Sequence, residues 1–459
     1  MDRTSQSKHH MMDMTTGDPV KHILLFALPA LIGNVFQQVY NLSDSVIVGR
    51  FVGPDALAAV GSSSSLVFLF FALCTGIGNG GGIVVSQFYG AGDAANVKKC
   101  IVNTGLIMLI VPVIVGSLGY AFAPSILRIL DTPADILPDS TLYIRYMSIG
   151  LLFVSLYNYL AAMLRALGDS RTPLYFLIVS TLLNVGLDIM LVYNFKMGVK
   201  GVALATITAQ LISALSCGIY AVRVNPYFKL KRSDFVFSGN MLYSVIRLGV
   251  PMSLQFGLIS ISSMAVQRVV NSYGTIVIAA FTATNRIEQL IHQPYTTLGA
   301  SLATYSGQNY GAKKLDRVYD GYKKGFLIMF VLTAFMILTM QLFGGAITGM
   351  FVTDPQVIAL GKTGLRITSL FYPALGAIYV IRGVLTGVGD AFFALFNGIV
   401  EVIGRFTLPI LMTKYMGMGA TGIWVSAGVV WIVSGITAWM RYRAYLYHRI
   451  KPSATSSSS

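Results

Sequence analysis

Charge is scarce in this chain, and acidic charge is scarcer still. Only 11% of its 459 residues are charged, and just two of its 18 acidic residues are glutamates. An ordinary soluble domain has roughly 25% charged residues, so this composition excludes a soluble enzyme of two or three domains. Cysteine is also rare. Cys74, Cys100 and Cys217 lie in or beside apolar runs, so no disulfide framework is expected.

Long apolar runs without any Asp, Glu, Lys or Arg take the place of charge. They cover 56–92, 100–127, 146–164, 201–222, 248–267, 325–353 and 415–440. Each reaches the ~18–20 residues that an α-helix needs to cross a hydrocarbon core ~30 Å thick. We therefore expect an all-α polytopic membrane protein with twelve transmembrane helices, at approximately 21–49, 57–88, 100–122, 142–164, 172–195, 200–222, 242–271, 276–308, 324–346, 357–386, 391–413 and 418–445.

The basic residues predict the orientation of these spans. In a soluble protein a formal net charge of +15 would suggest nucleic acid or an acidic partner. If both termini are cytoplasmic, however, twenty basic residues fall in inner segments and six in outer ones. This bias is the positive-inside pattern. It predicts a multi-pass protein of the inner or plasma membrane with both termini in the cytoplasm, and no nucleic-acid partner.

The chain also repeats itself at an offset of 221 residues. Residues 87–91 (Gln-Phe-Tyr-Gly-Ala) recur at 308–312 (Gln-Asn-Tyr-Gly-Ala), and Gly168-Asp169 recurs as Gly389-Asp390. Six spans thus repeat as six, so both copies face the same way, an architecture of secondary transporters. We predict a cytoplasmic N-terminal tail at 1–20, an N-lobe at 21–222, a cytoplasmic linker at 223–240, a C-lobe at 241–445 and a cytoplasmic C-terminal tail at 446–459.

Four acids lie inside predicted spans, namely Asp44, Asp188, Glu288 and Glu401. An ionised carboxylate there costs several kcal/mol unless it is paired or hydrated, so each is a functional candidate. Asp44, Asp188 and Thr206 lie six to eight residues from basic residues that mark the predicted outer surface, which corresponds to about 9–12 Å of helix. Three different helices therefore bring oxygen ligands to one level of the N-lobe.

Neighbouring polar residues extend this level into a site. Asn184 lies one helical turn from Asp188, and Tyr40 and Gln37 lie one and two turns from Asp44. Two carboxylates, an amide and a hydroxyl suit either a proton or Na⁺. Two nearby acids at low dielectric cannot both ionise cheaply, so we expect the pair to hold a proton. The structural alternative is that Asp44 packs locally and Asp188 only bonds Asn184.

The second half of the chain lacks this set. At the repeat offset Asp188 corresponds to Pro409, Asn184 to Arg405 and Thr206 to Ala427. Its own acids, Glu288 and Glu401, lie near the middle of the membrane. Two interpretations stay open: a buried ion-pair network of Arg286, Glu401 and Arg405 that fixes packing, or a Glu288 carboxylate that faces a cavity and attracts cationic compounds.

Helix-breaking and small residues have structural interpretations. Pro29 and Pro251, which correspond across the repeat with one residue of slip, are expected to bend the first helix of each lobe. The glycine-rich run 76–82 follows no strand and lies in a charge-free span, so close helix packing or a bend is favoured over a nucleotide loop.

Taken in order, several motifs resemble the multidrug and toxic compound extrusion (MATE) family over about residues 19–450. They are Pro29, Gln37, Tyr40, Asn41, Asp44, Gly49 and Gly53 in the first span and its loop, the repeated Gln-x-Tyr-Gly-Ala box, 164–169, 184–188 and 197–206. The chain is more similar to the DinF-like and MepA-like branch than to the NorM-like branch, whose Na⁺ ligands in the seventh and tenth spans it lacks. That difference favours H⁺ coupling.

The resemblance implies two six-helix lobes that form a V and export organic cations by alternating access in exchange for inward H⁺ or Na⁺. It implies a cation site at Asp44, Asn184, Asp188 and Thr206, which could also hold Na⁺. It further implies a drug cavity lined by Gln37, Tyr40 and Asn158, and bending of the first span when Asp44 is protonated.

These observations together predict a monomeric multidrug antiporter whose partners are small organic cations and the lipid bilayer. No cofactor, no resident metal and no enzymatic activity are expected. A lipid-linked oligosaccharide flippase of the same superfamily is the alternative, although it would favour fourteen spans and a cationic cavity. A membrane-embedded enzyme is disfavoured because no His-Glu-x-x-His motif or nucleophile elbow is present. A non-transporting sensor or channel is a further alternative.

Overall fold

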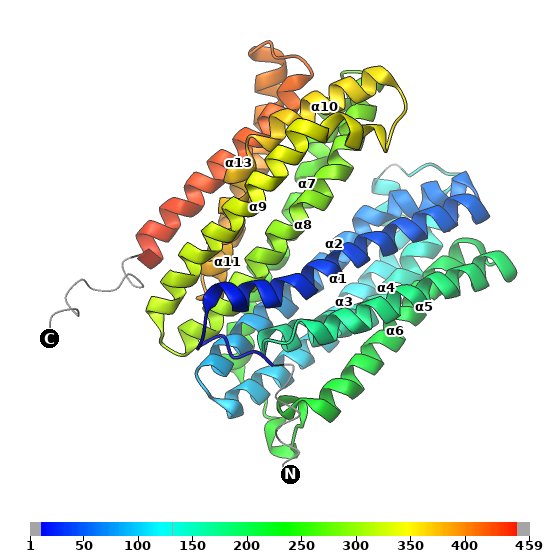
Figure 1. Cartoon of the computed structure of the whole chain (residues 1–459). Helices are drawn as coiled ribbons and strands as arrows, with labels where there is room; N and C mark the ends of the chain where they lie inside the picture. Colours follow the sequence, from blue (N-terminus) through cyan, green and yellow to red (C-terminus); the bar gives the residue numbers. More distant parts are fainter. Residues whose placement is uncertain (1–10, 131, 448–459) are drawn as a thin grey trace, which may run out of the picture. The chain divides into compact units, whose positions relative to one another are not determined.

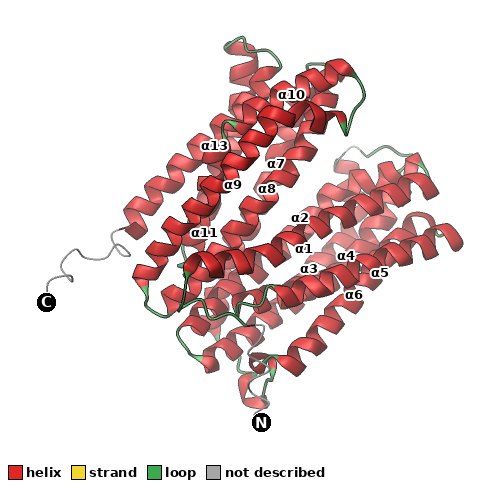
Figure 2. Ribbon diagram, in the orientation of Figure 1, coloured by secondary structure: helices red, strands yellow, loops and turns green. Residues whose placement is uncertain are grey.

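The structure is a computed structural model that describes residues 11–130 and 132–447, and these residues form helices and no strands (Figures 1 and 2). Within them, ten helices are long and apolar enough to cross a membrane, or eleven if one bent pair is counted as a single span. The all-α polytopic fold is thereby confirmed, whereas the count of twelve stays a prediction. Helix α8 (Thr275–Gly311) is 37 residues long and continuous, but it is not among these ten, because Arg286, Glu288 and His292 lower the hydropathy of its middle.

The first half of the chain contains six helices and a linker. They are α1 (Pro19–Ile47), α2 (Pro54–Gly90), α3 (Ala94–Ile129), α4 (Leu137–Ala166), α5 (Arg171–Asp188) and α6 (Gly198–Val224). Two π-helical turns, η2 (Val48–Val52) and η3 (Ile189–Asn194), follow α1 and α5, and the linker holds the short 3₁₀ turns η4 (Pro226–Phe228) and η5 (Arg232–Asp234). Helix α4 packs against α2, α3 and α6 and forms the centre of this half.

The second half repeats the pattern with one break. Its elements are α7 (Gly239–Asn271), α8, α9 (Leu315–Gly349), α10 (Pro355–Ser369), α11 (Tyr372–Gly387), α12 (Ala391–Ile410), η6 (Leu411–Tyr415), α13 (Thr421–Arg441) and η7 (Tyr442–Tyr447). At the repeat offset α10 and α11 correspond to the continuous helix α4, but they meet at 49°. Pro373 accounts for the break, because it has no N–H to donate to the Ser369 carbonyl oxygen, as the next bond of a continuous helix would require.

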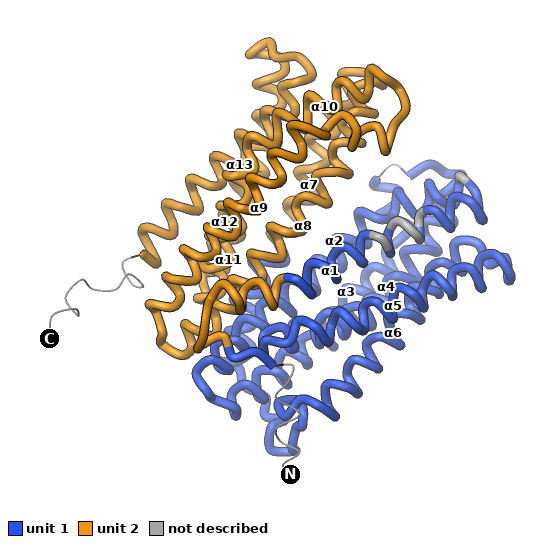
Figure 3. The backbone as a smooth tube through the Cα atoms, in the orientation of Figure 1, with its two compact units in different colours: residues 1–13, 28–254 blue, residues 14–27, 255–459 orange. Residues whose placement is uncertain are grey.

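Contacts divide the chain into two compact units (Figure 3). The first contains Leu28–Leu254 and the second contains Met14–Ala27 and everything from Gln255 onward, with residues 11–13 assigned to the first. The division thus falls inside α1 and α7, close to Pro29 and Pro251. The lobe boundaries drawn from the sequence stay a prediction, and residues 1–10 and 448–459 of the two predicted tails lie outside the described residues.

Small residues attach the beginning of α7 to α2 within the first unit. Gly76 and Gly80 of α2 face Ser253 and Gly249 of α7, and a Cβ built on Gly80 would lie 2.5 Å from the Gly249 nitrogen. Ser253 Oγ also donates to the Leu73 carbonyl oxygen at 2.7 Å. Two small residues spaced four apart on each helix allow this approach of backbones. The packing interpretation of the glycine-rich run is confirmed.

The residues before α1 are held by the second copy of the repeated box within the second unit. Met14 N donates to Gln308 Oε1 at 3.0 Å, and Asn309 Nδ2 donates to Met14 O at 3.1 Å. Arg317 adds bonds from Nη2 to Met14 O at 3.0 Å and from Nη1 to Gly17 O at 2.9 Å. Because the Met14 side chain is fully buried, this segment is an integral part of the second unit.

Candidate functional site

Asp44 and Asp188 come together in the first unit through the side chain of Asn184. Asp44 lies near the end of α1, while Asn184 and Asp188 lie one turn apart at the end of α5 and are completely buried. With the Asn184 amide turned so that its nitrogen faces the acids, which is the orientation that hydrogen bonding favours, this nitrogen donates to Asp44 Oδ1 at 2.8 Å and to Asp188 Oδ2 at 3.2 Å. One amide group therefore bridges two carboxyl groups from different helices.

The Asp44 and Asp188 carboxyl groups lie close enough to share a hydrogen bond. A carboxylate has acceptor oxygens only, so that bond forms only when one of the two groups carries a proton. Asp188 Oδ1 is buried and accepts no hydrogen bond from a described donor. In this arrangement the pair suits one shared proton better than two negative charges.

Hydroxyl groups lie around the pair. Tyr40 is buried and its hydroxyl donates to Thr206 Oγ1 at 3.3 Å, so the structure links these two predicted residues. The Tyr40 hydroxyl also interacts electrostatically with Asp44 and Asp188, as does that of Tyr143 on α4. Sequence reasoning missed Tyr143, because no spacing of residues in the sequence predicts which face of α4 lies toward α1 and α5.

Irregular turns cover the end of the site. The π-helical turns η2 and η3 directly follow the helices that carry Asp44 and Asp188, and Phe51 and Tyr193 from these turns make an edge-to-face contact at 5.3 Å. Such π-turns are frequent at functional sites. The second half has the same kind of turn without the acid, because η6 follows α12 at the equivalent place and Pro409 stands where Asp188 stands in the first half. The turn therefore belongs to the repeated architecture.

The other predicted cavity residues are less closely connected. Gln37 on α1 and Asn158 on α4 are half-buried, and neither hydrogen-bonds to the Asp44 and Asp188 pair within the described ranges. Pro29 and Pro251 lie inside α1 and α7 as predicted. The cavity role of Gln37 and Asn158 and the bending role of both prolines stay predictions.

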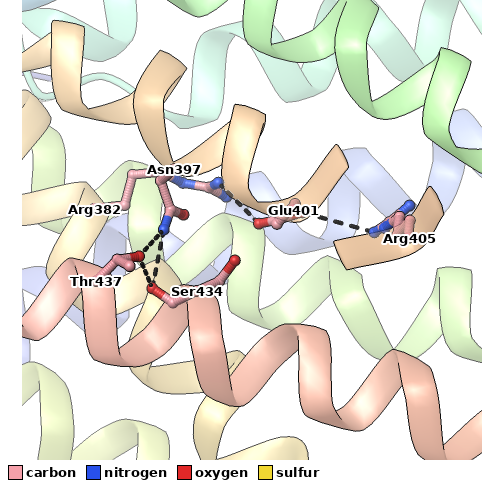
Figure 4. Close-up of polar contacts among 6 residues, drawn as sticks. All are labelled: Arg382, Asn397, Glu401, Arg405, Ser434 and Thr437. Carbon is pink, nitrogen blue, oxygen red and sulfur yellow. Dashed lines mark hydrogen bonds and ion pairs between the residues drawn. The ribbon is translucent and has the colours of Figure 1, made fainter. Parts of the chain in front are cut away.

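Glu401 forms two ion pairs in the second unit (Figure 4). Its Oε2 lies 3.7 Å from Arg405 Nη2 on the same helix, and its Oε1 lies 4.0 Å from Arg382 Nη1 on α11. Arg382 also lies over the Tyr379 ring, 4.7 Å from its centre. A basic residue within a span is as much a candidate as an acid, so this rule, applied to bases, would have singled out Arg382 in the sequence.

Arg286 does not belong to this network, which is a correction to the predicted set. It is exposed, and it makes no ion pair or hydrogen bond with the residues that the structure describes. Glu288 on the same helix is half-buried and lies near Thr368 of α10, while its Oε1 atom is buried without a described hydrogen-bond partner. Glu288 and Glu401 therefore have different surroundings, the first largely unpaired and the second placed between two arginines.

The fold and the site together define a class of protein. A helical membrane protein built from two parallel repeats, with a close pair of carboxyl groups inside one repeat, has the organisation of a secondary transporter. A sequence model of the MatE family matches residues 29–190 and again residues 251–408, once in each half. The chain belongs to the MatE family, and the double match agrees with the internal repeat.

Individual relatives agree with this membership. The chain is 28% identical over 434 residues to the probable multidrug resistance protein YpnP of Bacillus subtilis, covering 94% of this chain and 96% of the relative. It is 24% identical to the multidrug export protein MepA of Staphylococcus haemolyticus, covering 88% of each chain. A solved structure of a MATE protein in complex with MaL6 has the same fold, with a TM-score of 0.90 at 23% identity over 95% of this chain and 98% of that one.

Proposed function

We propose that this protein is a secondary active exporter of organic, mostly cationic, compounds that exchanges them for inward protons by alternating access. It would act as a monomer in the inner or plasma membrane with both termini in the cytoplasm. The observation that carries the proposal is the close pairing of the Asp44 and Asp188 carboxyl groups beside Asn184. The names of YpnP and MepA support multidrug compounds as the substrate class.

The closeness of the two carboxyl groups supports H⁺ as the coupling ion. Two nearby carboxyl groups at low dielectric cannot both ionise cheaply, so the pair of Asp44 and Asp188 favours one shared proton. Na⁺ would take the amide oxygen of Asn184 as a ligand, whereas a shared proton is compatible with the amide nitrogen facing the carboxyl groups. Binding of a proton from outside would neutralise the pair, and its release inside would restore the negative charge that the next cycle requires.

The energy available sets what one proton can do. One inward charge at 100 mV supplies about 2.3 kcal/mol and each pH unit about 1.4 kcal/mol, together enough for a gradient of several hundredfold of a neutral compound. A monovalent cation that leaves in exchange for one proton moves no net charge. Its gradient would therefore follow the pH difference alone, at about tenfold per unit.

The test is uptake of ethidium into inverted membrane vesicles that contain the full chain, with an imposed pH gradient (acid inside) or an imposed Na⁺ gradient. We expect the pH gradient to drive uptake, and Asp44→Asn and Asp188→Asn each to abolish it. Asp55→Asn, which changes an exposed aspartate at the start of α2, should transport as the wild type does. Normal transport by both site variants would refute the coupling site, and a response to Na⁺ alone would refute H⁺ coupling.

In this proposal the Glu288 carboxylate makes the exporter prefer cationic over uncharged compounds. Its buried Oε1 atom has no described hydrogen-bond partner, so it would be available to a positively charged substrate. Gln37, Tyr40 and Asn158 would line the cavity with it. Glu288→Gln should lower transport of ethidium more than transport of an uncharged substrate. Glu401→Gln should not discriminate between the two, since Glu401 is already paired with Arg382 and Arg405. Equal loss of both substrates in Glu288→Gln would argue against a direct role in cation recognition.

A further inference from the structure

A pocket of about 620 Å³ lies between the end of α3 and the beginning of α4, within the first unit. The only charged side chains that line it are those of Arg128 and Arg145, and they are accompanied by the polar side chains of Tyr120, Thr141 and Tyr146. No acid lines it. The linker residues contact the opposite end of α3, where Lys98 Nζ donates to Lys229 O at 3.0 Å. The pocket therefore opens on the membrane face away from the linker.

Arg145 is held in place by a defect in α3. Pro124 lies four residues after Tyr120 and has no N–H, so the Tyr120 carbonyl oxygen lacks its helical donor. Arg145 Nε donates to that oxygen at 3.4 Å, and its guanidinium lies 5.2 Å from the centre of the Tyr120 ring. Arg128, in the last turn of α3, is exposed and has no hydrogen-bond or ion-pair partner in the described part of the chain. Both arginines thus line the same pocket, and no acid among the described residues forms an ion pair with either of them.

The rest of the lining is apolar and reaches toward the middle of the bilayer. Pro124, Leu142 and Ile149 form this part, and Ile149 is 53% exposed on a face of a membrane-crossing helix. A site with two guanidinium groups at one end and an exposed apolar wall at the other matches the two parts of a phospholipid, an anionic head group and acyl chains. Guanidinium groups bind phosphate with particular strength because they donate two parallel hydrogen bonds.

The internal repeat provides a comparison within the same molecule. Arg366 corresponds to Arg145, and Gln341 corresponds to Tyr120. Arg366 donates to the Gln341 carbonyl oxygen from Nε at 3.0 Å and from Nη2 at 2.8 Å. The arginine-to-carbonyl bond is thus common to both halves. The second arginine is not, because Arg128 corresponds to Gly349. In addition, Lys362 stands where the first half has Thr141, a residue that lines the pocket. The Lys362 side chain packs on Gly345, and a Cβ built on Gly345 would lie 3.2 Å from Lys362 Cδ.

We propose that the pocket between α3 and α4 binds the phosphate of an anionic phospholipid, with Arg128 and Arg145 as its ligands. The lipid would come from the leaflet away from the linker. Helix α4 carries this pocket on one face and Tyr143, which interacts with Asp44 and Asp188, on another. A bound lipid would therefore contact a helix that also borders the carboxyl pair.

The test is native mass spectrometry of the purified full chain, titrated with phosphatidylglycerol, with phosphatidylcholine and with glycerol 3-phosphate. We expect tighter binding of phosphatidylglycerol than of phosphatidylcholine. Arg128→Gln should weaken binding of phosphatidylglycerol about fivefold, the effect typical of one basic residue at a membrane surface. Lys414→Gln, an exposed basic residue in η6 of the second unit, should leave it unchanged.

A second pair of variants separates binding from stability. Arg145→Gln and Arg366→Gln each remove an arginine bound to a helix carbonyl, but only Arg145→Gln should lose phosphatidylglycerol. Equal binding by Arg128→Gln and Lys414→Gln would overturn the proposal, as would equal binding of the two lipids. Displacement of phosphatidylglycerol by millimolar glycerol 3-phosphate would also overturn it, because the pocket would then be a site for soluble phosphate.

Discussion

The contact between Gly80 of α2 and Gly249 of α7 yields the most direct prediction of stability. A Cβ built on Gly80 would lie 2.5 Å from Gly249 N and 2.6 Å from Gly249 Cα, against 3.4 Å for an ordinary contact. Since backbone cannot rotate away as a flexible side chain can, α2 and α7 must separate by about 0.9 Å in Gly80→Ala. Overpacking of this kind costs about 1–3 kcal/mol.

The same helix offers a matched control. Gly61 of α2 has no atom within 4 Å of a built Cβ, so Gly61→Ala keeps the packing and gains about 0.5–1 kcal/mol from helix propensity. Because Gly80→Ala gains the same helix propensity, the two alanine variants should differ by the overpacking cost alone, about 1–3 kcal/mol in the free energy of unfolding. Titration with SDS in mixed micelles, followed by circular dichroism, measures this difference. Equal stability of Gly80→Ala and Gly61→Ala would refute the packing argument.

Three further predictions concern other contacts. Asn184→Ala removes the amide that lies between Asp44 and Asp188 and should lower proton-driven ethidium transport at least tenfold while leaving the amount of folded protein in the membrane within twofold; unchanged transport would contradict a bridging role. Arg317→Gln removes the bonds to Met14 and Gly17 and should speed amide exchange of residues 14–17 at least tenfold, measured by mass spectrometry, and no change there would mean that the box residues suffice. Trp424→Phe keeps an aromatic ring but loses the 3.0 Å bond from Nε1 to Thr284 Oγ1, so it should cost about 1 kcal/mol in SDS titration, and a value near zero would show that Thr284 finds another donor.

Sequence spacing predicts depth in the membrane well and direction around a helix poorly. Equal depth predicts Asp44 and Asp188 at one level, and the structure places them close together with the Asn184 amide between them. The pairing of Glu401 with Arg405 also follows from spacing alone, because residues four apart share a helix face. Proximity in sequence to Glu288 predicts Arg286 in the same network, yet Arg286 is exposed and forms no ion pair with the described residues.

Contacts between distant segments were beyond that reasoning. Arg382 reaches Glu401 from α11, and Tyr143 comes near the carboxyl pair from α4, and both depend on how neighbouring helices are rotated. The break between α10 and α11 is different, because Pro373 marks it in the sequence. The prediction of one unbroken span at 357–386 did not take Pro373 into account.

The attachment of residues 14–17 to the second unit also bears on the order in which the protein is made. Met14 and Gln308 are 294 residues apart, so ribosomal synthesis at about 5–20 residues per second leaves the segment without its partners for about 15–60 s. The beginning of α7, by contrast, meets a completed α2 as soon as it emerges. A nascent chain that stops anywhere before α8 therefore carries an unattached N-terminal segment, including the normally buried Met14. Exposure of that segment would mark an unfinished molecule to proteases and chaperones on that side of the membrane.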